Sequence, residues 1–161
     1  MTRLPRWLPA ANRVVRALNR AGLRIGTIHV LTVPGRTSGK PRATPVSPLR
    51  LDGQRYVIAG LADAQWARNV RAAGHGVLAR GRRGEDVRLT EVTDPERRRA
   101  VMRAFPTEVP HGVPFFVSLG LVRRADPDEF AAAADRVAVF RVDVERPGNP
   151  NEGSRAGGTA A

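Results

Sequence analysis

The sequence reads VLTVPGRTSGKPRATPV from Val30 to Val46. Residues 26–33 are rich in β-branched side chains and too few for a typical helix, so they predict a strand covered on both faces. A loop is expected over residues 34–42, and Thr44-Pro45-Val46 begins the next strand. Because proline has no N–H to donate to a neighbouring strand, Pro45 indicates an edge strand or an irregular strand start.

The loop gathers groups that bind anions. Two glycines, Gly35 and Gly39, let the backbone turn tightly and approach a ligand closely. Two hydroxyls and three cations accompany them, namely Thr37, Ser38, Arg36, Lys40 and Arg42. Guanidinium groups and backbone amides bind phosphate or carboxylate oxygens. The loop is therefore either a phosphate cradle or a solvated turn, and both interpretations stay open on the loop alone.

The loop does not match the common nucleotide motifs. A P-loop has four residues between its glycines and a Ser or Thr after its lysine. Here three residues separate Gly35 from Gly39, and Pro41 follows Lys40. The dinucleotide fingerprint is also excluded, because its later glycines are missing and no helix follows.

Alternation and turn signals predict further strands. Residues 43–51 and 54–60 are expected to form a hairpin around Asp52-Gly53, and residues 76–80 and 85–93 a second one across the turn 81–84. A last strand is expected over 136–144. The total is about six strands, mostly antiparallel, and this favours an α+β, mainly β fold: a sheet or small barrel with helices packed outside.

Capping signals place the helices. A helix is predicted from Asp63, as N-cap, to Ala73, with Gly74 as its stop. Two more begin at Asp94-Pro95, ending near Phe105-Pro106, and at Asp126-Pro127, ending near Asp135. Residues 106–120 are apolar but broken by prolines, so they are interpreted as loop or short helix.

The two ends differ from the middle of the chain. Residues 1–24 are basic and contain an amphipathic helix over 9–21, with Gly22 as its stop. This helix either covers the core or lies on an anionic membrane surface. Residues 25–146 are expected to form the barrel domain, and the tail 147–161, rich in Gly, Pro, Asn and Ala, is expected to be disordered.

Composition narrows the class of protein. The chain has 161 residues, 42% of them hydrophobic, no cysteine and a formal net charge of +12. Disulfides and cysteine chemistry are excluded, and a cytoplasmic location is expected. Lys40 is the only lysine among the 27 basic residues. Since the arginines are dispersed with few aromatic residues between them, nucleic acid is not the expected partner. The three histidines lie far apart in sequence, so no metal site is predicted.

Two side chains downstream of the loop are further candidates for a binding site. Trp66 and Asn69 are three residues apart on a predicted helix and share a face. A tryptophan can cover a planar ring or fill a core, and an asparagine can orient a carbonyl group or cap a turn. For each of these two residues, the binding role and the structural role both stay open.

Together, the stretch 30–46 and the segment from Trp66 to Gly74 resemble the deazaflavin-dependent nitroreductase family of actinobacteria. The resemblance covers residues 15–144. It implies a split β-barrel, related to the FMN-binding pyridoxamine-phosphate-oxidase-like barrels. It also implies an oxidoreductase that passes a hydride from the reduced deazaflavin coenzyme F420 to a nitro compound, a quinone or an activated double bond.

The resemblance also implies roles for individual residues. The cofactor's phosphate and polyglutamate tail would be held by Arg36, Ser38, Lys40 and Arg42. Thr37 and Gly39 of the same loop are also counted among the cofactor-binding residues, although family members often have a basic residue where Thr37 stands. The deazaflavin ring would be lined by Thr44, Pro45 and Val46. The pocket would be closed by Trp66 and Asn69. Some family members carry a tyrosine in the late helix, and the stretch 130–134 has none.

No side chain needs to act as a nucleophile, because the cofactor supplies the hydride. Charge developing on the acceptor would be met by backbone N–H groups or a pocket hydroxyl. Ser47 and Tyr56 are the candidates, although Tyr56 in a strand is also explained by packing.

Two other classes of function remain as alternatives. The same barrel can bind FMN, haem or a lipid-like ligand, with or without turnover. A basic protein can also bind nucleic acid or a membrane surface. The expected partners are a small-molecule acceptor, a second copy in a homodimer, and a membrane contacted peripherally through the N-terminal helix.

Overall fold

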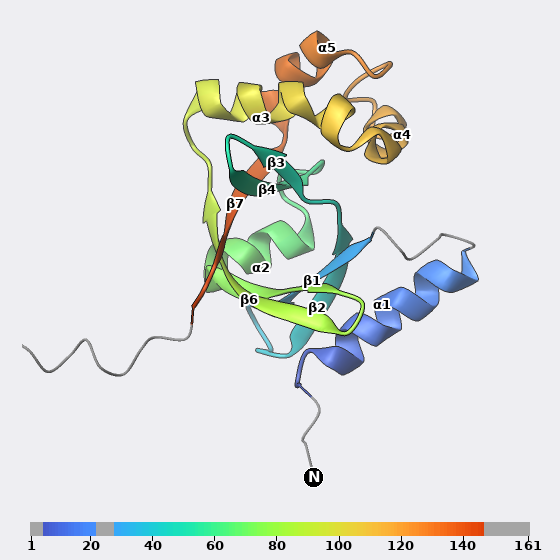
Figure 1. Cartoon of the computed structure of the whole chain (residues 1–161), viewed down its shortest axis with the longest axis vertical. Coiled ribbons are helices and arrows are strands. Elements are labelled where there is room, and N and C mark those ends of the chain that lie inside the picture. The colour runs from blue at the N-terminus through green and yellow to red at the C-terminus, as the bar shows by residue number, and fades with distance from the viewer. Residues whose placement is uncertain (1–4, 22–27, 147–161) are drawn as a thin grey trace, which may run out of the picture.

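The computed structural model describes residues 5–21 and 28–146. Seven strands form one antiparallel sheet in the order β2-β1-β5-β6-β7-β4-β3 (Figure 1). Their bounds are β1 His29–Pro34, β2 Pro41–Val46, β3 Leu49–Leu51, β4 Gln54–Ala59, β5 His75–Arg80, β6 Arg83–Glu91 and β7 Ala138–Val144. The mainly β, antiparallel split barrel expected from the sequence is confirmed, with one strand more than predicted.

The connector Ser47-Pro48 explains the curl of the sheet. It joins β2 to β3, and these two strands lie at opposite edges of the sheet. Such a short link spans both edges only if the sheet bends back on itself, as a barrel does. The single strand expected over 43–51 is therefore wrong. Pro48 has no N–H for a ladder, and the two halves pair with different partners, β2 with β1 and β3 with β4.

Both predicted hairpin turns are present. Asp52 and Gly53 have positive φ angles of 51° and 74°, as a two-residue hairpin turn requires. The second turn is tighter than predicted, because β6 begins at Arg83 and leaves only residues 81–82 between the strands. Gly81 takes φ 61° there.

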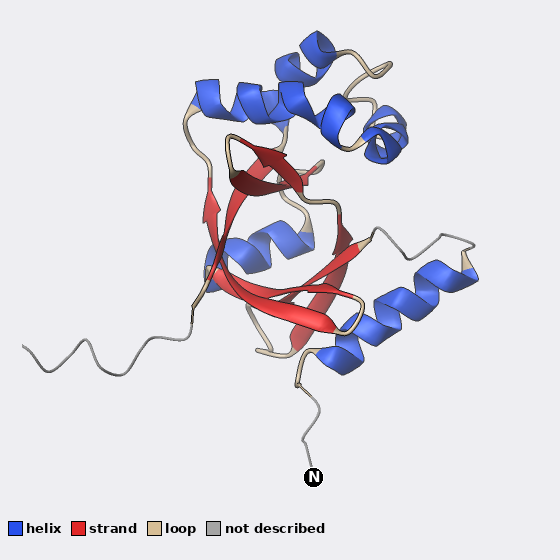
Figure 2. Cartoon of the chain, in the orientation of Figure 1, coloured by secondary structure: helices blue, strands red, loops and turns tan. Residues whose placement is uncertain are grey.

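The helices lie outside the sheet in separate groups (Figures 1 and 2). Their bounds are α1 Leu8–Arg20, α2 Gln65–Ala73, α3 Pro95–Glu108, α4 Val113–Ser118 and α5 Pro127–Ala132, with short 3-10 turns η2 Pro110–Gly112 and η3 Ala134–Arg136. Helix α1 packs against β1 and β2. Helices α3, α4 and α5 gather at the end of the molecule away from α1 (Figure 1).

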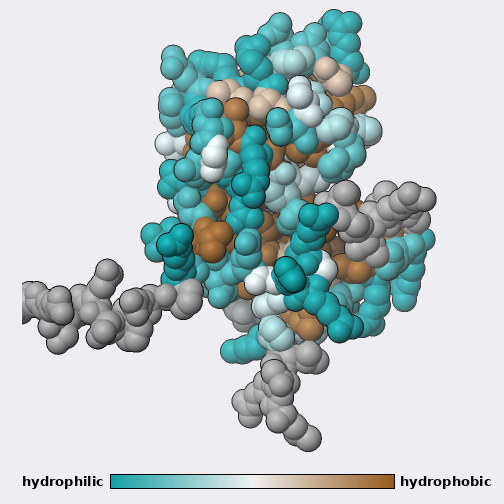
Figure 3. All heavy atoms as spheres, viewed as in Figure 1, coloured by the Kyte–Doolittle hydropathy of each residue, from teal (hydrophilic) through white to brown (hydrophobic). Residues whose placement is uncertain are grey.

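Strands β4 and β7 separate two hydrophobic cores. Tyr56 and Val139 face a core built with α3, α4 and α5. Their chain neighbours Val57 and Phe140 face the other core, which α2 covers with Ala67 and Val70. This alternation follows from the two-residue period of a strand, and it explains the apolar runs 56–59 in β4 and 138–140 in β7. Hydrophilic side chains cover most of the face shown in Figure 3.

Several predicted boundaries shift. Asp63 does not cap α2, which begins at Gln65, and the Asp63 carboxylate instead lies 3.9 Å from the Arg71 guanidinium. Helix α3 continues through Pro106, because the N–H of Val109 still donates to the Phe105 carbonyl at 2.8 Å. The lost donor of Pro106 is offset by burial of its ring.

The other helix signals are confirmed. Asp94 and Asp126 each cap a helix, accepting hydrogen bonds from the N–H groups of Glu96 and Asp128. Gly74 ends α2 in the left-handed conformation. The proline-broken stretch 106–120 holds the end of α3, η2 and α4, and the last strand begins at Ala138 because η3 precedes it.

Some expectations fall outside the described residues. These are the helix stop at Gly22, the start of the first strand at residues 26–27 and the tail 147–161. Within the described ranges, no helix combines the length and apolarity needed to cross a membrane.

Candidate functional site

The loop between β1 and β2 is held in one conformation by its own backbone. The Gly35 N–H donates to the Lys40 carbonyl, and the Gly39 N–H donates to the Gly35 carbonyl, both at 2.8 Å. Gly39 has φ 68°, which disfavours any other residue. A Cβ on Gly35 would lie 3.0 Å from the Ser38 hydroxyl. Both glycines are thus required for this tight turn.

The fixed loop leaves hydrogen-bond donors available. Within the described residues, the backbone N–H groups of Thr37 and Ser38 donate to no protein acceptor. The Ser38 hydroxyl accepts from the Lys40 N–H at 3.2 Å, which holds this side chain inside the turn. Successive unpaired N–H groups beside guanidinium groups form a typical anion-binding concavity.

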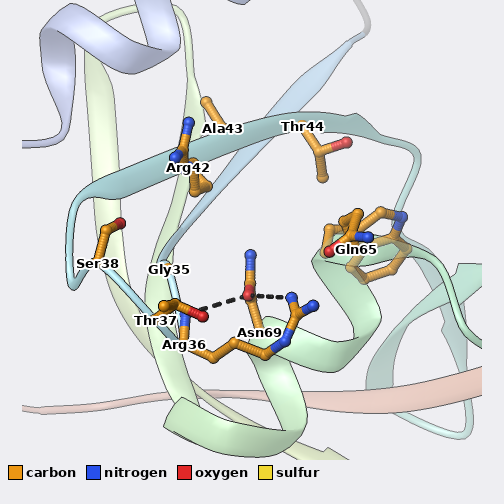
Figure 4. A pocket seen from close by; sticks show the side chains of 10 residues that line it. Gly35, Arg36, Thr37, Ser38, Arg42, Ala43, Thr44, Gln65 and Asn69 are labelled. Atoms are coloured by element: carbon orange, nitrogen blue, oxygen red, sulfur yellow. Dashed lines mark hydrogen bonds between the residues drawn. The ribbon is translucent and has the colours of Figure 1, made fainter.

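Asn69 links the loop to α2. Its side-chain Oδ1 accepts two hydrogen bonds from Arg36, one from the backbone N–H at 3.2 Å and one from Nη1 at 3.0 Å. These bonds fix the orientation of the amide, so Nδ2 is left to donate elsewhere. Figure 4 shows this nitrogen pointing away from Arg36 and toward β2. Asn69 is only 6% exposed, so its orientation is held by packing as well.

A cleft of about 610 Å³ lies between the loop, β2 and the start of α2 (Figure 4). Its lining residues are Gly35, Arg36, Thr37, Ser38, Arg42, Ala43, Thr44, Gln65, Trp66 and Asn69. Arg36 and Arg42 are the charged members of this set, and both are cations. Trp66 forms an apolar wall, since its half-buried ring packs at 5.9 Å from the ring of Phe140.

Helix α2 is anchored by Arg71. Its guanidinium donates to both carboxylate oxygens of Glu91, at 2.8 and 2.9 Å, and to the Ala62 carbonyl at 2.9 Å. It also lies over the Phe140 ring at 5.8 Å. The hydrogen bond with Arg71 lowers the pKa of Glu91 below its usual value, and the same bond raises the pKa of Arg71. This pair holds the helix that carries Trp66 and Asn69.

The structure brings most of the predicted cofactor residues together. Arg36, Thr37, Ser38, Arg42, Thr44, Trp66 and Asn69 all line the cleft. Four others lie outside its lining, namely Gly39, Lys40, Pro45 and Val46. Gly39 shapes the turn, Lys40 is exposed beside it, Pro45 is exposed and Val46 is buried in the core under α2.

Alternation along β2 explains part of this division. Arg42 and Thr44 face the cleft, whereas Pro45 lies on the other face. The edge position that Pro45 indicated is confirmed, because β2 is the first strand in the sheet order.

Three lining residues were missed from the sequence. Gly35 was expected only to shape the loop, Ala43 has no functional group, and Gln65 precedes the tryptophan that drew attention. Ala43 and Gln65 could have been found from their positions, because Ala43 directly follows Arg42 and Gln65 directly precedes Trp66.

The two candidate hydroxyls lie apart from this lining. Ser47 follows the end of β2, and its Oγ lies 3.2 Å from the Nε2 of His111. Tyr56 is buried in the core beside α3, where its hydroxyl accepts from the Arg97 Nε at 2.9 Å. Its packing role is thus evident. No group of three or more potential metal ligands occurs among the described residues.

The lining suits a flat ligand with an anionic end. Cations and unpaired amides gather at the start of β2, and Thr44 and the apolar ring of Trp66 belong to the same lining. Such a cleft on a split antiparallel barrel can hold a cofactor that combines a flat ring with a phosphate. The family model for F420H2-dependent quinone reductases matches residues 9–111, and the chain belongs to this family. It is therefore an oxidoreductase with the deazaflavin F420 as its cofactor.

Solved structures share the fold. A protein described as a domain-swapped dimer is 22% identical, with a TM-score of 0.51 over 82% of this chain and 98% of the other. A conserved hypothetical protein from Mycobacterium tuberculosis is 14% identical, with a TM-score of 0.52 over 88% and 93%. A protein from Listeria innocua, assigned to the pyridoxamine 5′-phosphate oxidases, is 12% identical, with a TM-score of 0.50 over 84% and 94%. None of the curated proteins matches the sequence.

Proposed function

We propose that the protein transfers a hydride from reduced F420 to a small electron-poor acceptor, with a quinone as the first choice. A nitro compound or an activated double bond is the related alternative. The observation that carries the proposal is the cleft along β2, with Arg36 and Arg42 at one end and Trp66 at its wall. The family match supports a quinone as acceptor.

The residues of the cleft have separate roles in this proposal. Arg36 and Arg42, with the N–H groups of Thr37 and Ser38, hold the phosphate, and exposed Lys40 extends the positive surface toward the acidic tail. Thr44 and Trp66 contact the ring. The bound coenzyme supplies the hydride, and the protein binds it, orients it and limits access of water.

The Arg42→Ala variant tests the phosphate assignment. It removes one cation from the start of the cleft, and a lost charge-assisted hydrogen bond costs about 1.5–3 kcal/mol. The dissociation constant of oxidised F420, measured by fluorescence titration, is expected to rise about tenfold or more. Arg99→Ala is the matched control, because Arg99 is exposed on α3 and outside the cleft. Equal affinity of wild type and Arg42→Ala would remove the phosphate assignment.

The assembly and location of the protein are part of the proposal. We propose a homodimer, a state also seen in one structural neighbour described as a domain-swapped dimer. Light scattering coupled to size-exclusion chromatography would measure it. Contact with a membrane would use the arginine face of α1, since Ala11 on the apolar face is buried against the barrel. Vesicle sedimentation would detect such contact.

A further inference from the structure

Ser47 and His111 form a polar pair outside the cofactor cleft. Ser47 Oγ lies 3.2 Å from His111 Nε2, although the two residues are 64 positions apart. Ser47 belongs to the connector between opposite edges of the sheet, and His111 belongs to η2 at the start of the helical group. The contact therefore depends on the closure of the barrel and on the docking of the helices.

Strand β2 relates this pair to the cofactor cleft. The anion-binding loop precedes β2 at Pro41, and Ser47 directly follows its last residue, Val46. Thr44 lines the cleft, and Ser47 lies three residues further on, or about 10 Å at about 3.3 Å per residue. The anion-binding loop and the pair thus lie at opposite ends of the same edge strand, with Thr44 of the cleft lining between them.

Exposed apolar side chains lie on α4, which packs against η2, and just after β4. Leu61 and Phe115 are 57% and 55% exposed, and hydrophobic atoms reach the surface near α4 in Figure 3. Helix α4 comes close to the end of β4, since a Cβ on Gly60 would lie 2.7 Å from Leu119 and 3.1 Å from Phe115. A hydroxyl and an imidazole next to exposed apolar side chains suit an acceptor with an apolar body and a reducible oxygen.

We propose that Ser47 donates a proton to the acceptor oxygen and that His111 resupplies it. This inference rests on the proposed function. The acceptor takes up two electrons with the hydride. One O–H bond then forms at its oxygen as the Ser47 O–H bond breaks, and Ser47 regains a proton from the Nε2 of His111. The imidazole is exposed, so water returns the proton. Ser47 is the catalytic residue in this scheme and His111 acts through it.

The surroundings of His111 contain few charges. Turn η2 packs against α3 and α4, and α4 has no charged residue. On α3, Arg97 and Arg103 bind Asp52 and Asp128, and Arg98 donates to backbone carbonyls. On the α3 side, Glu108 is the charged residue nearest to His111 in sequence. On β3, which follows Ser47, Arg50 is exposed.

The kinetic test compares Ser47→Ala, Ser47→Thr and His111→Gln with wild type, using a water-soluble 1,4-naphthoquinone as acceptor. General acid catalysis contributes about 10²–10⁴-fold, so Ser47→Ala is expected to lower kcat about a hundredfold or more. Ser47→Thr keeps the hydroxyl and restores most of the rate. His111→Gln cannot pass a proton to Ser47 and is expected to lower kcat with little change in the KM for the quinone. His75→Gln, at an exposed histidine on β5, is the matched control and keeps the wild-type kcat.

Two measurements do not depend on turnover. F420 affinity is expected to be unchanged in all four variants, because none of them alters the cleft lining. Addition of the oxidised naphthoquinone to the wild-type protein is expected to shift the His111 ring signals in NMR spectra, with no shift at His75. Wild-type kcat in both Ser47→Ala and His111→Gln would overturn the inference and leave the proposed function intact. Failure of the wild-type protein to bind F420 would instead overturn the proposed function.

Discussion

At the scale of single residues, Asn69 is a side chain whose orientation is fixed by hydrogen bonds from its neighbours. The Oδ1 of Asn69 accepts two hydrogen bonds from Arg36, so the Nδ2 of Asn69 is oriented to donate toward the cleft. The Asn69→Asp variant keeps an acceptor for Arg36 but loses this donor and adds a negative charge near the proposed phosphate site. F420 binding, followed by fluorescence, is expected to weaken about tenfold, which corresponds to about 1.4 kcal/mol.

The control for this variant is Asn12→Asp, which makes the same chemical change on the exposed face of α1. It is expected to leave the affinity within about twofold of wild type, because surface charges at a distance are screened by salt. If Asn69→Asp binds F420 as well as wild type does, Nδ2 contributes nothing to the cofactor site.

Residue types alone predicted part of the lining of this cleft. Arginines, hydroxyls and glycines in one short loop indicate anion binding wherever they occur, and Pro45 indicated an edge strand. The link between Arg36 and Asn69 could not be predicted, because it joins residues 33 positions apart. Nor could the contact between Ser47 and His111, since local sequence patterns contain no information on which distant segments meet.

At the scale of elements, the position of α2 depends on the Arg71–Glu91 pair at the end of β6. The folded-state pKa of Glu91 is lowered, mainly by the hydrogen bond from Arg71. A carboxylate of this kind stabilises the fold above its unfolded pKa, which is about 4.3, and loses that contribution as pH falls through the folded value. The Tm difference between wild type and Glu91→Gln is therefore expected to be largest near neutral pH and to shrink below about pH 4.

The comparison with Glu108→Gln isolates the effect of the pair. The Glu108 side chain forms no ion pair or hydrogen bond within the described ranges, so its variant is expected to follow the wild-type melting curve at every pH. A Glu91→Gln variant whose Tm equals that of wild type at neutral pH would contradict the assigned role of Arg71. Trp66 fluorescence in the same samples would report whether the start of α2 moves.

Element boundaries show where local signals compete with packing. The aspartate caps at Asp94 and Asp126 were predicted, because capping is a contact between near neighbours. Pro106 was expected to end α3, yet the ring is buried and the helix continues to Glu108. Here tertiary burial outweighed the local preference.

At the scale of the whole molecule, the chain forms a curled sheet with one core on each side of β4 and β7. Hairpins between consecutive strands were predictable from turn residues. The pairings of β1 with β5, β6 with β7 and β7 with β4 were not. Alternation of apolar residues predicts which face of a strand is buried but does not select its neighbour. The connector Ser47-Pro48 contained the strongest clue, because a proline interrupts what otherwise reads as one strand.

Helix α1 is either part of the cooperative fold of the barrel or a tether, that is, a segment joined to the barrel without adding to its stability. Trp7, one residue before α1, packs on β6 so closely that a Cβ on Gly84 would lie 2.5 Å from its ring. The φ angle of Gly84 is not positive, so a larger residue there would act through this contact and through a second, looser approach of 3.0 Å to Val77 Cγ1. In a Trp66→Phe background, where Trp7 is the sole tryptophan, Gly84→Leu is expected to displace the ring and shift its fluorescence to longer wavelength.

The same variant tests how far the docking of α1 reaches into the barrel. Helix α1 covers β1 and β2, the strands on either side of the anion-binding loop, so its release is expected to lower Tm and to speed amide exchange in β1. Arg82→Leu introduces the same side chain in the adjacent hairpin turn, at an exposed position. It is expected to leave the Tm and the amide exchange in β1 unchanged. If Gly84→Leu shifts the fluorescence but alters neither Tm nor exchange in β1, α1 is a tether. If the Trp7 fluorescence, the Tm and the amide exchange in β1 all change, the helix belongs to the fold that holds the anion-binding loop. The arginines on its outer face are then free to contact a membrane while the helix stays docked on the barrel.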